Sequence, residues 1–189
     1  MNMTNNITFT SKITPLTNSN FSKITSAFNR DNFVGFPWDL SNSRIAKDVF
    51  TNNVQDCSVC LLTDGDKALL MHLMPFNEKN YTYSKIYKLF ENNFDLNDKN
   101  LQAVLLGSKP TKPSQYIYNL LTSVLNNLGI STTVLKTGKS ATSLAYRTCK
   151  DEIFVANKHI TKALDAGKSA KEAVNAGFET VIISPADVI

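Results

Sequence analysis

Two short apolar runs joined by a tight turn limit what this chain can fold into more than any other feature. They lie within residues 51–75, and the turn falls at Asp64-Gly65-Asp66. An Asp-Gly pair between apolar runs is a strong signal for a β-hairpin. The first predicted strand begins with Cys57, and the second carries one polar side chain inside it, that of His72. The sequence therefore predicts a hairpin that brings Cys57 and His72 near the same end of its two strands.

The pairing of Cys57 with His72 is the central hypothesis about function. A thiolate nucleophile requires at least a thiol beside an imidazole, because the ring accepts the thiol proton. Cys57 lies where the polar segment 52–56 becomes an apolar strand, which gives it access on one side and burial on the other. A lone histidine on an apolar strand is more often a satisfied core residue, so the hypothesis depends on the pair.

Three other interpretations of Cys57 stay open. Cys57-x-x-Cys60 is half of a zinc-binding motif, and a complete site needs Cys149 or His72 from distant strands. The same spacing occurs in redox sites at the start of a helix. Here it lies in strand-like sequence, where the two side chains point to opposite faces. Cysteine is also a common core residue, which suits Cys60 and Cys149 best.

The rest of the pattern predicts an α/β (α+β) fold, with a layered mixed β-sheet or sandwich core flanked by two main helices. Residues 1–32 are rich in Asn, Thr and Ser and are expected to be flexible, and residues 33–189 are expected to form a single catalytic domain. Ser114 is expected to cap the clearest helix, which runs to Leu128 and stops at Gly129. Further helices are expected over 43–49, 83–93 and 169–175, and strands over 101–106, 130–136, 143–147, 152–157 and 180–184.

Composition narrows the classes of function. The chain has 189 residues, of which 42% are hydrophobic and 19% charged, as in soluble globular domains. No apolar run approaches the roughly 20 residues that span a bilayer, and no Sec-type signal peptide is expected. The net charge of +4 is mild and the lysines are scattered, which disfavours a nucleic-acid partner. Three cysteines without an export signal indicate free thiols in a reducing compartment.

The order of these residues resembles that of the CheD chemoreceptor glutamine deamidases. In that family a threonine lies six positions before a nucleophilic cysteine, and a histidine opens a short His-x-Met-Leu-Pro-like motif. Thr51, Cys57 and His72 stand in that order here, and Leu73-Met74-Pro75 completes the motif with one residue absent. Residues 125–158 are similar to the family's later segment, which has a helix ending in Gly-Ile, a strand, a Thr-Gly turn and a closing hairpin. The resemblance covers residues 45–158 and leaves 159–189 as a C-terminal extension.

The chain also departs from that family at two places. The family has a glycine-rich approach to its cysteine, where this chain has Val54-Gln55-Asp56, and a glycine pair after its middle strand, where this chain has Leu106-Gly107-Ser108. Toxin deamidases that include cytotoxic necrotizing factor look similar in fold and in the order of the site residues.

The resemblance implies a protein-glutamine deamidase, a hydrolase that converts a glutamine side chain to glutamate and releases ammonia. Cys57 is then the nucleophile, His72 takes its proton and stabilises the thiolate, and Thr51 orients the imidazole through its hydroxyl or main-chain carbonyl. Gln55 and Asp56 are alternatives to Thr51 for the third role. Neither a cofactor nor a metal is required. The implied partner is a protein that carries the target glutamine, with no nucleic acid and no membrane span.

Two settings fit this chemistry. One is the bacterial cytoplasm, with a chemoreceptor as substrate. The other is a host cell, into which a bacterial effector is secreted without a cleaved Sec signal to modify a host protein; the family departures and the Asn/Thr-rich head favour it. Transglutamination or amide hydrolysis at the same site is an alternative reaction. A non-catalytic binding module, with Cys57 and His72 as buried structural residues, is the alternative to an enzyme.

Overall fold

The computed structural model describes residues 11–35, 40–107, 111–136 and 140–183, which form two mixed β-sheets and five α-helices. The strands of the larger sheet are β2 (Arg44–Ala46), β4 (Ser58–Thr63), β5 (Ala68–Leu73), β6 (Gln102–Gly107), β7 (Ser131–Lys136) and β10 (Glu179–Ile183). They lie side by side in the order β10-β7-β6-β4-β5-β2. The strands of the smaller sheet are β1 (Lys12–Pro15), β3 (Asp48–Val54), β8 (Thr142–Arg147) and β9 (Glu152–Asn157), in the order β1-β9-β8-β3.

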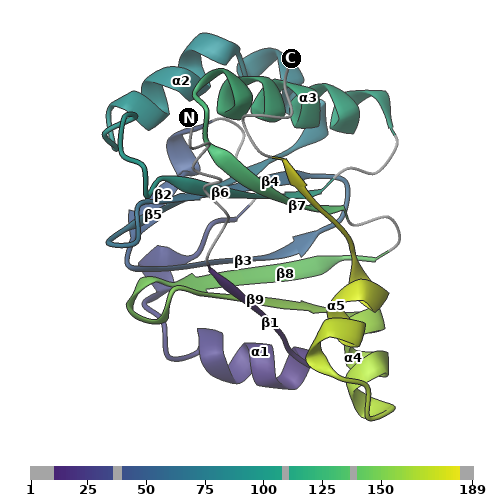
Figure 1. Cartoon of the computed structure of the whole chain (residues 1–189). Helices are drawn as coiled ribbons and strands as arrows, with labels where there is room; N and C mark the ends of the chain where they lie inside the picture. The colour runs from purple at the N-terminus through teal and green to yellow at the C-terminus, as the bar shows by residue number, and fades with distance from the viewer. Residues whose placement is uncertain (1–10, 36–39, 108–110, 137–139, 184–189) are drawn as a thin grey trace, which may run out of the picture.

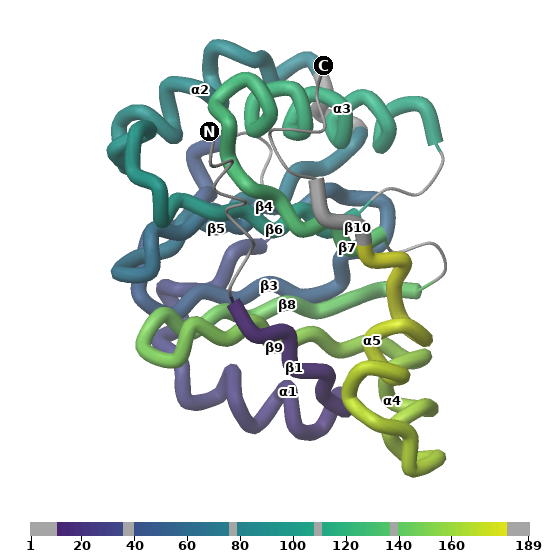
Figure 2. The backbone as a smooth tube through the Cα atoms, viewed as in Figure 1, coloured from purple at the N-terminus to yellow at the C-terminus, as the bar shows by residue number. Residues whose placement is uncertain are grey.

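The two sheets face each other, and helices cover their outer faces (Figure 1). The outer face of the larger sheet is covered by α2 (Tyr83–Glu91) and α3 (Lys112–Asn127), and that of the smaller sheet by α1 (Asn18–Thr25). The helices α4 (Lys158–Asp165) and α5 (Ala170–Gly177) pack against each other beside the sheets, and α5 leads into β10 (Figure 2). The predicted α+β class is confirmed, with two facing sheets at its centre.

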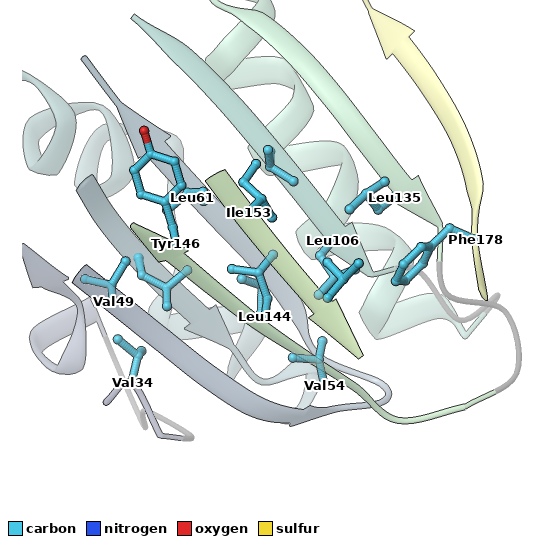
Figure 3. Packing of buried hydrophobic residues seen from close by; sticks show 14 of the residues in the cluster. Val34, Val49, Val54, Leu61, Leu106, Leu135, Leu144, Tyr146, Ile153 and Phe178 are labelled. Carbon is cyan, nitrogen blue, oxygen red and sulfur yellow. The ribbon is translucent and has the colours of Figure 1, made fainter. Parts of the chain in front are cut away.

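Side chains from both sheets fill the space between them. Leu61 and Leu106 come from the larger sheet, and Val49 and Leu144 come from the smaller one, all of them fully buried (Figure 3). Full burial of a leucine side chain contributes about 2 kcal/mol to folding. The layer between the sheets is therefore one of two large apolar cores, the other lying under α2 and α3, and the end of the predicted hairpin lies within it.

Burial on both faces explains why β4 reads as an unbroken apolar run. Val59 and Leu61 face the smaller sheet, whereas Cys60 and Leu62 face the helices on the other side. A strand covered on both faces has no solvent side, so the usual alternation of polar and apolar residues disappears.

The predicted hairpin is confirmed as β4 and β5, which pair antiparallel. The carboxylate of Asp64 accepts hydrogen bonds from the N–H groups of Asp66 and Lys67, both at 3.0 Å. Gly65 has a φ of +95°, a conformation that residues with a side chain rarely adopt. The chemistry of this turn fixes which residues of the two strands lie opposite each other.

The clearest predicted helix is confirmed as α3, but its start differs. Thr111 is the N-cap, and its hydroxyl accepts from the N–H of Ser114. The prediction of Ser114 as the cap is wrong, because Pro113 fits the first turn of a helix, where its missing N–H costs nothing. The helix stops as predicted, with Gly129 at a φ of +68°.

Most other predicted elements are confirmed, with their ends moved by a few residues. The helices over 83–93 and 169–175 are α2 and α5, and the strands over 101–106, 130–136, 143–147 and 152–157 are β6, β7, β8 and β9. The last strand is β10, and Ser184 at its predicted end lies outside the described residues. No α-helix in the described part of the chain is long and apolar enough to cross a membrane.

The predicted helix over 43–49 is wrong, because this segment forms β2 and the start of β3. Ile45 pairs with Leu69 of β5, and Val49 pairs with Tyr146 of β8. Ile and Val are β-branched and fit a pleated strand well. Pairing with strands distant in the sequence therefore outweighs the weak local helical pattern.

The N-terminal part has more structure than the expected flexible segment. Strand β1 pairs with β9, and α1 begins at the N-cap Thr17. Phe21 of α1 packs with Phe154 on the outer face of the smaller sheet, and Ile24 packs against the same cluster, so two apolar residues anchor a mostly polar helix. Residues 1–10 of the expected segment lie outside the described residues. Helix α4 was not predicted, although Asn157 caps its start through two hydrogen bonds of 2.9 Å.

Candidate active site

The hairpin brings Cys57 and His72 to the same end and the same face of the larger sheet. Val59 lies directly opposite His72, and Cys57 precedes Val59 by two residues. Cys57 and Val59 both belong to the core between the sheets. Diagonal neighbours of this kind have Cα atoms about 7–8 Å apart, and their Cβ atoms are closer. Cys57 lies in the bend just before β4 rather than at the start of the strand, and extending the register by one residue makes it a diagonal neighbour of His72. The sequence predicted that the two residues share this end of the hairpin.

Thr51 reaches this pair from the other sheet. It lies on β3, and its hydroxyl oxygen is 2.6 Å from Nδ1 of His72. The same hydroxyl donates to the main-chain carbonyl of Val34 at 2.5 Å. Val34 is held beside β3 because its N–H donates to the carbonyl of Phe50 at 2.9 Å. The imidazole is thus tied to the facing sheet through one threonine.

These contacts determine which nitrogen of His72 carries the proton. A carbonyl oxygen only accepts, so the Thr51 hydroxyl must give its single proton to Val34. The 2.6 Å contact with His72 then requires the imidazole to donate from Nδ1. In the neutral ring, Nε2 consequently keeps its lone pair. Thr51 therefore fixes the tautomer in which Nε2 is able to accept a proton.

Burial favours the neutral forms of both side chains. His72 is 0% exposed, and burial lowers its pKa from 6.5 to about 4. Cys57 is 7% exposed, and its pKa is raised to about 11, mainly by burial and further by the neighbouring Asp56 carboxylate. The remaining exposure of the pair therefore belongs to Cys57 rather than to His72.

The backbone at Cys57 is held from two neighbouring elements. Gly107, the last residue of β6, has a φ of +141°, and a Cβ atom there would lie 2.8 Å from the Cys57 carbonyl oxygen. Ser114, in the first turn of α3, donates from its hydroxyl to the carbonyl of Asp56 at 2.7 Å. The polypeptide just before and after Cys57 is therefore confined by β6 and α3.

The competing interpretations of the cysteines find less support in the geometry. Cys60 belongs to the core under α3, on the face opposite Cys57, as predicted for a Cys-x-x-Cys motif in a strand. Cys149 is exposed, in the turn between β8 and β9. Within the described ranges, no group of three or more His, Cys, Asp or Glu side chains is arranged to hold a metal ion.

Of the three candidates for orienting His72, Thr51 contacts its imidazole through a hydrogen bond of 2.6 Å. Gln55 is exposed, and the Asp56 carboxylate raises the pKa of Cys57, which opposes thiolate formation. The contact is made by the Thr51 hydroxyl, one of the two groups that the sequence left open for this role.

Sequence reasoning missed three residues at this site. Val34 contributes through its carbonyl, which every residue has, so no sequence signal marks it. Ser114 did carry a signal, because it is a polar residue on the face of α3 that also holds the buried Ile117 and Leu121. Gly107 was visible as the glycine that ends a buried strand.

No protein-family model matches this chain, and no curated protein matches its sequence.

Proposed function

We propose that this chain is a protein-glutamine deamidase, in which Cys57 attacks the side-chain carboxamide of a glutamine on a partner protein. The observation that carries the proposal is the hydrogen-bond chain from Val34 through Thr51 to Nδ1 of His72. It presets the imidazole as a proton acceptor beside a cysteine that retains some exposure. A histidine with a purely structural role in an apolar core would not require a thiol as its diagonal neighbour.

The resting site is a neutral pair rather than a preformed ion pair. The gap between a thiol pKa of about 11 and an imidazole pKa of about 4 corresponds to about 10 kcal/mol for proton transfer. Even at a separation of about 4 Å, attraction between the two resulting charges would return only about 4 kcal/mol at the effective dielectric typical of proteins. Proton transfer therefore accompanies the attack on the substrate, with His72 as a general base.

The reaction proceeds in two halves. In the first, the Cys57 sulfur bonds to the carboxamide carbon as its proton moves to Nε2 of His72, and the carbonyl oxygen becomes an oxyanion. The imidazolium then gives its proton to the leaving nitrogen, and ammonia departs from a thioester. In the second, water attacks the thioester, His72 takes a proton from it and returns it to the sulfur, and glutamate is released.

The product places a new negative charge on the surface of the partner protein. Such a change alters nearby ion pairs and hydrogen bonds in the way that other charge-changing modifications do. A chemoreceptor and a host protein both remain suitable substrates for this chemistry, the latter if the chain is an effector.

The test compares the wild-type chain with Cys57→Ser in two extracts, one bacterial and one eukaryotic. Peptide mass spectrometry should find glutamines converted to glutamate, with a gain of about one dalton per site, only in the wild-type sample. The extract that contains the modified peptides identifies the class of substrate.

Cys149→Ser is the matched control, because it removes an exposed thiol far from His72 in the sequence and should keep full activity. Activity that survives in Cys57→Ser would refute the nucleophile. Adding a primary amine separates the two reactions of the thioester, since a transglutaminase would form the amine adduct in preference to glutamate.

A further inference from the structure

The peptide unit that joins Asp56 to Cys57 has a fixed orientation. Its carbonyl accepts the hydroxyl proton of Ser114 at 2.7 Å, and Ser114 is fully buried in the first turn of α3. The hydroxyl of Thr111 in turn donates to Ser114 at 2.7 Å, which leaves the Ser114 proton directed at Asp56. The Asp56 carbonyl thus points toward α3.

A trans peptide places its C=O and N–H on opposite sides, and this peptide is trans. The N–H of Cys57 therefore points away from α3. Helix α3 covers the outer face of the larger sheet (Figure 1), and the Cys57 side chain belongs to the core on the inner face. The Cys57 N–H and the Cys57 thiol are consequently directed to the same side of the sheet.

Gly107 lets the end of β6 lie in close contact with the backbone at Cys57. A Cβ atom at this position would lie 2.8 Å from the Cys57 carbonyl and 3.1 Å from the Cα of Ser58. Real Cβ atoms essentially never come this close to backbone, so the absence of a side chain lets β6 pack directly against the start of β4. Ser114 holds one end of the Cys57 backbone while Gly107 confines the other.

From this arrangement we infer that Ser114 is a positioning residue, which aims the Cys57 main-chain N–H at the oxyanion formed when the Cys57 sulfur attacks a carbonyl. The inference rests on the proposed function, because an oxyanion forms only in such an attack. A backbone N–H is a suitable donor, since it is already fixed before the negative charge develops.

The experiment compares two reactions of the same thiol in a Cys149→Ser background. p-Nitrophenyl acetate acylates Cys57 through a tetrahedral oxyanion, giving a thioester and p-nitrophenol. Iodoacetamide alkylates Cys57 by displacing iodide, without an oxyanion. Ser114→Ala should slow acylation about tenfold or more, because an oxyanion donor is misdirected. Alkylation should change by less than about twofold, since it depends mainly on access and thiolate content.

Two further variants make the comparison specific. Ser114→Thr keeps the hydroxyl and should restore acylation. Thr122→Val is the matched control on the same helix, because it removes a hydroxyl that donates to the Tyr118 carbonyl at 2.9 Å, away from Cys57, and should leave both rates unchanged. Loss of folding would expose Cys57 and bring its pKa back toward the ordinary value, which speeds alkylation, so it is distinguished from the expected result, in which acylation alone falls.

Equal falls in acylation and alkylation for Ser114→Ala, or no fall in either, would overturn the inference. If the wild-type chain converts glutamine but Ser114→Ala has the wild-type ratio of acylation to alkylation rates, the role of Ser114 is refuted and the proposed function is retained. A changed ratio in a chain that converts no glutamine would refute the proposed function and keep the oxyanion donor.

Discussion

Replacing His72 by asparagine should remove a specific pH dependence of stability. Asparagine does not titrate, and its amide nitrogen stands near the position of Nδ1, so it can still donate to the Thr51 hydroxyl. The substitution therefore keeps the contact between the sheets and removes the titrating ring. The difference between the two proteins then reports the protonation of His72 alone, because carboxylates titrate equally in both.

The size of the effect follows from the two pKa values of this side chain. Burial holds the pKa of His72 at about 4 in the folded chain, against 6.5 for an unperturbed histidine. Between these values the unfolded chain binds a proton that the folded chain does not, so stability falls as the pH falls. Linkage gives a loss of about 2 kcal/mol at pH 5 and about 3 kcal/mol at pH 4, relative to pH 7.5.

Urea unfolding followed by circular dichroism at pH 7.5, 6, 5 and 4 measures this difference. The free energy of unfolding of the wild-type chain should fall by about 3 kcal/mol more than that of His72→Asn. His159→Asn, which removes the only other histidine, shows whether the fall belongs to His72. Parallel pH curves for wild type and His72→Asn would refute the reasoning, because they would mean that the ring binds a proton as readily in the folded chain as in the unfolded chain.

Two more predictions concern the same site. Thr51→Val should cost about 2 kcal/mol of stability in urea unfolding and most of the activity, because the Nδ1–H of His72 and the carbonyl of Val34 lose the hydroxyl between them; Thr51→Ser should restore both, and an unimpaired valine variant would contradict this role. In a Cys149→Ser background, the rate of Cys57 alkylation by iodoacetamide should rise about tenfold per pH unit from pH 7 to 10, since the thiol pKa is about 11. A plateau below pH 8 would indicate a stabilised thiolate instead.

The hairpin, its turn and the helix α3 were predictable because each is determined by residues that lie close together in the sequence. Asp64-Gly65 defines the turn, and the turn defines the register that sets Cys57 diagonal to His72. The segment around Ile45 was mispredicted for the opposite reason. Its strand partners, such as Leu69, are distant in the sequence, and no local pattern announces such pairing.

The amino-acid order by itself determined that a thiol and an imidazole share one end of a β-hairpin, since the turn chemistry and the two-residue period of strands are local properties. Only the packing of one sheet on the other brought the Thr51 hydroxyl to His72 and the Val34 carbonyl to Thr51. The same packing removed water from His72 and Cys57, and this burial decides their charge. The desolvation of a titratable side chain depends on all the sheets and helices packed around it. It is therefore determined by the assembled tertiary structure and not by any short segment of the sequence.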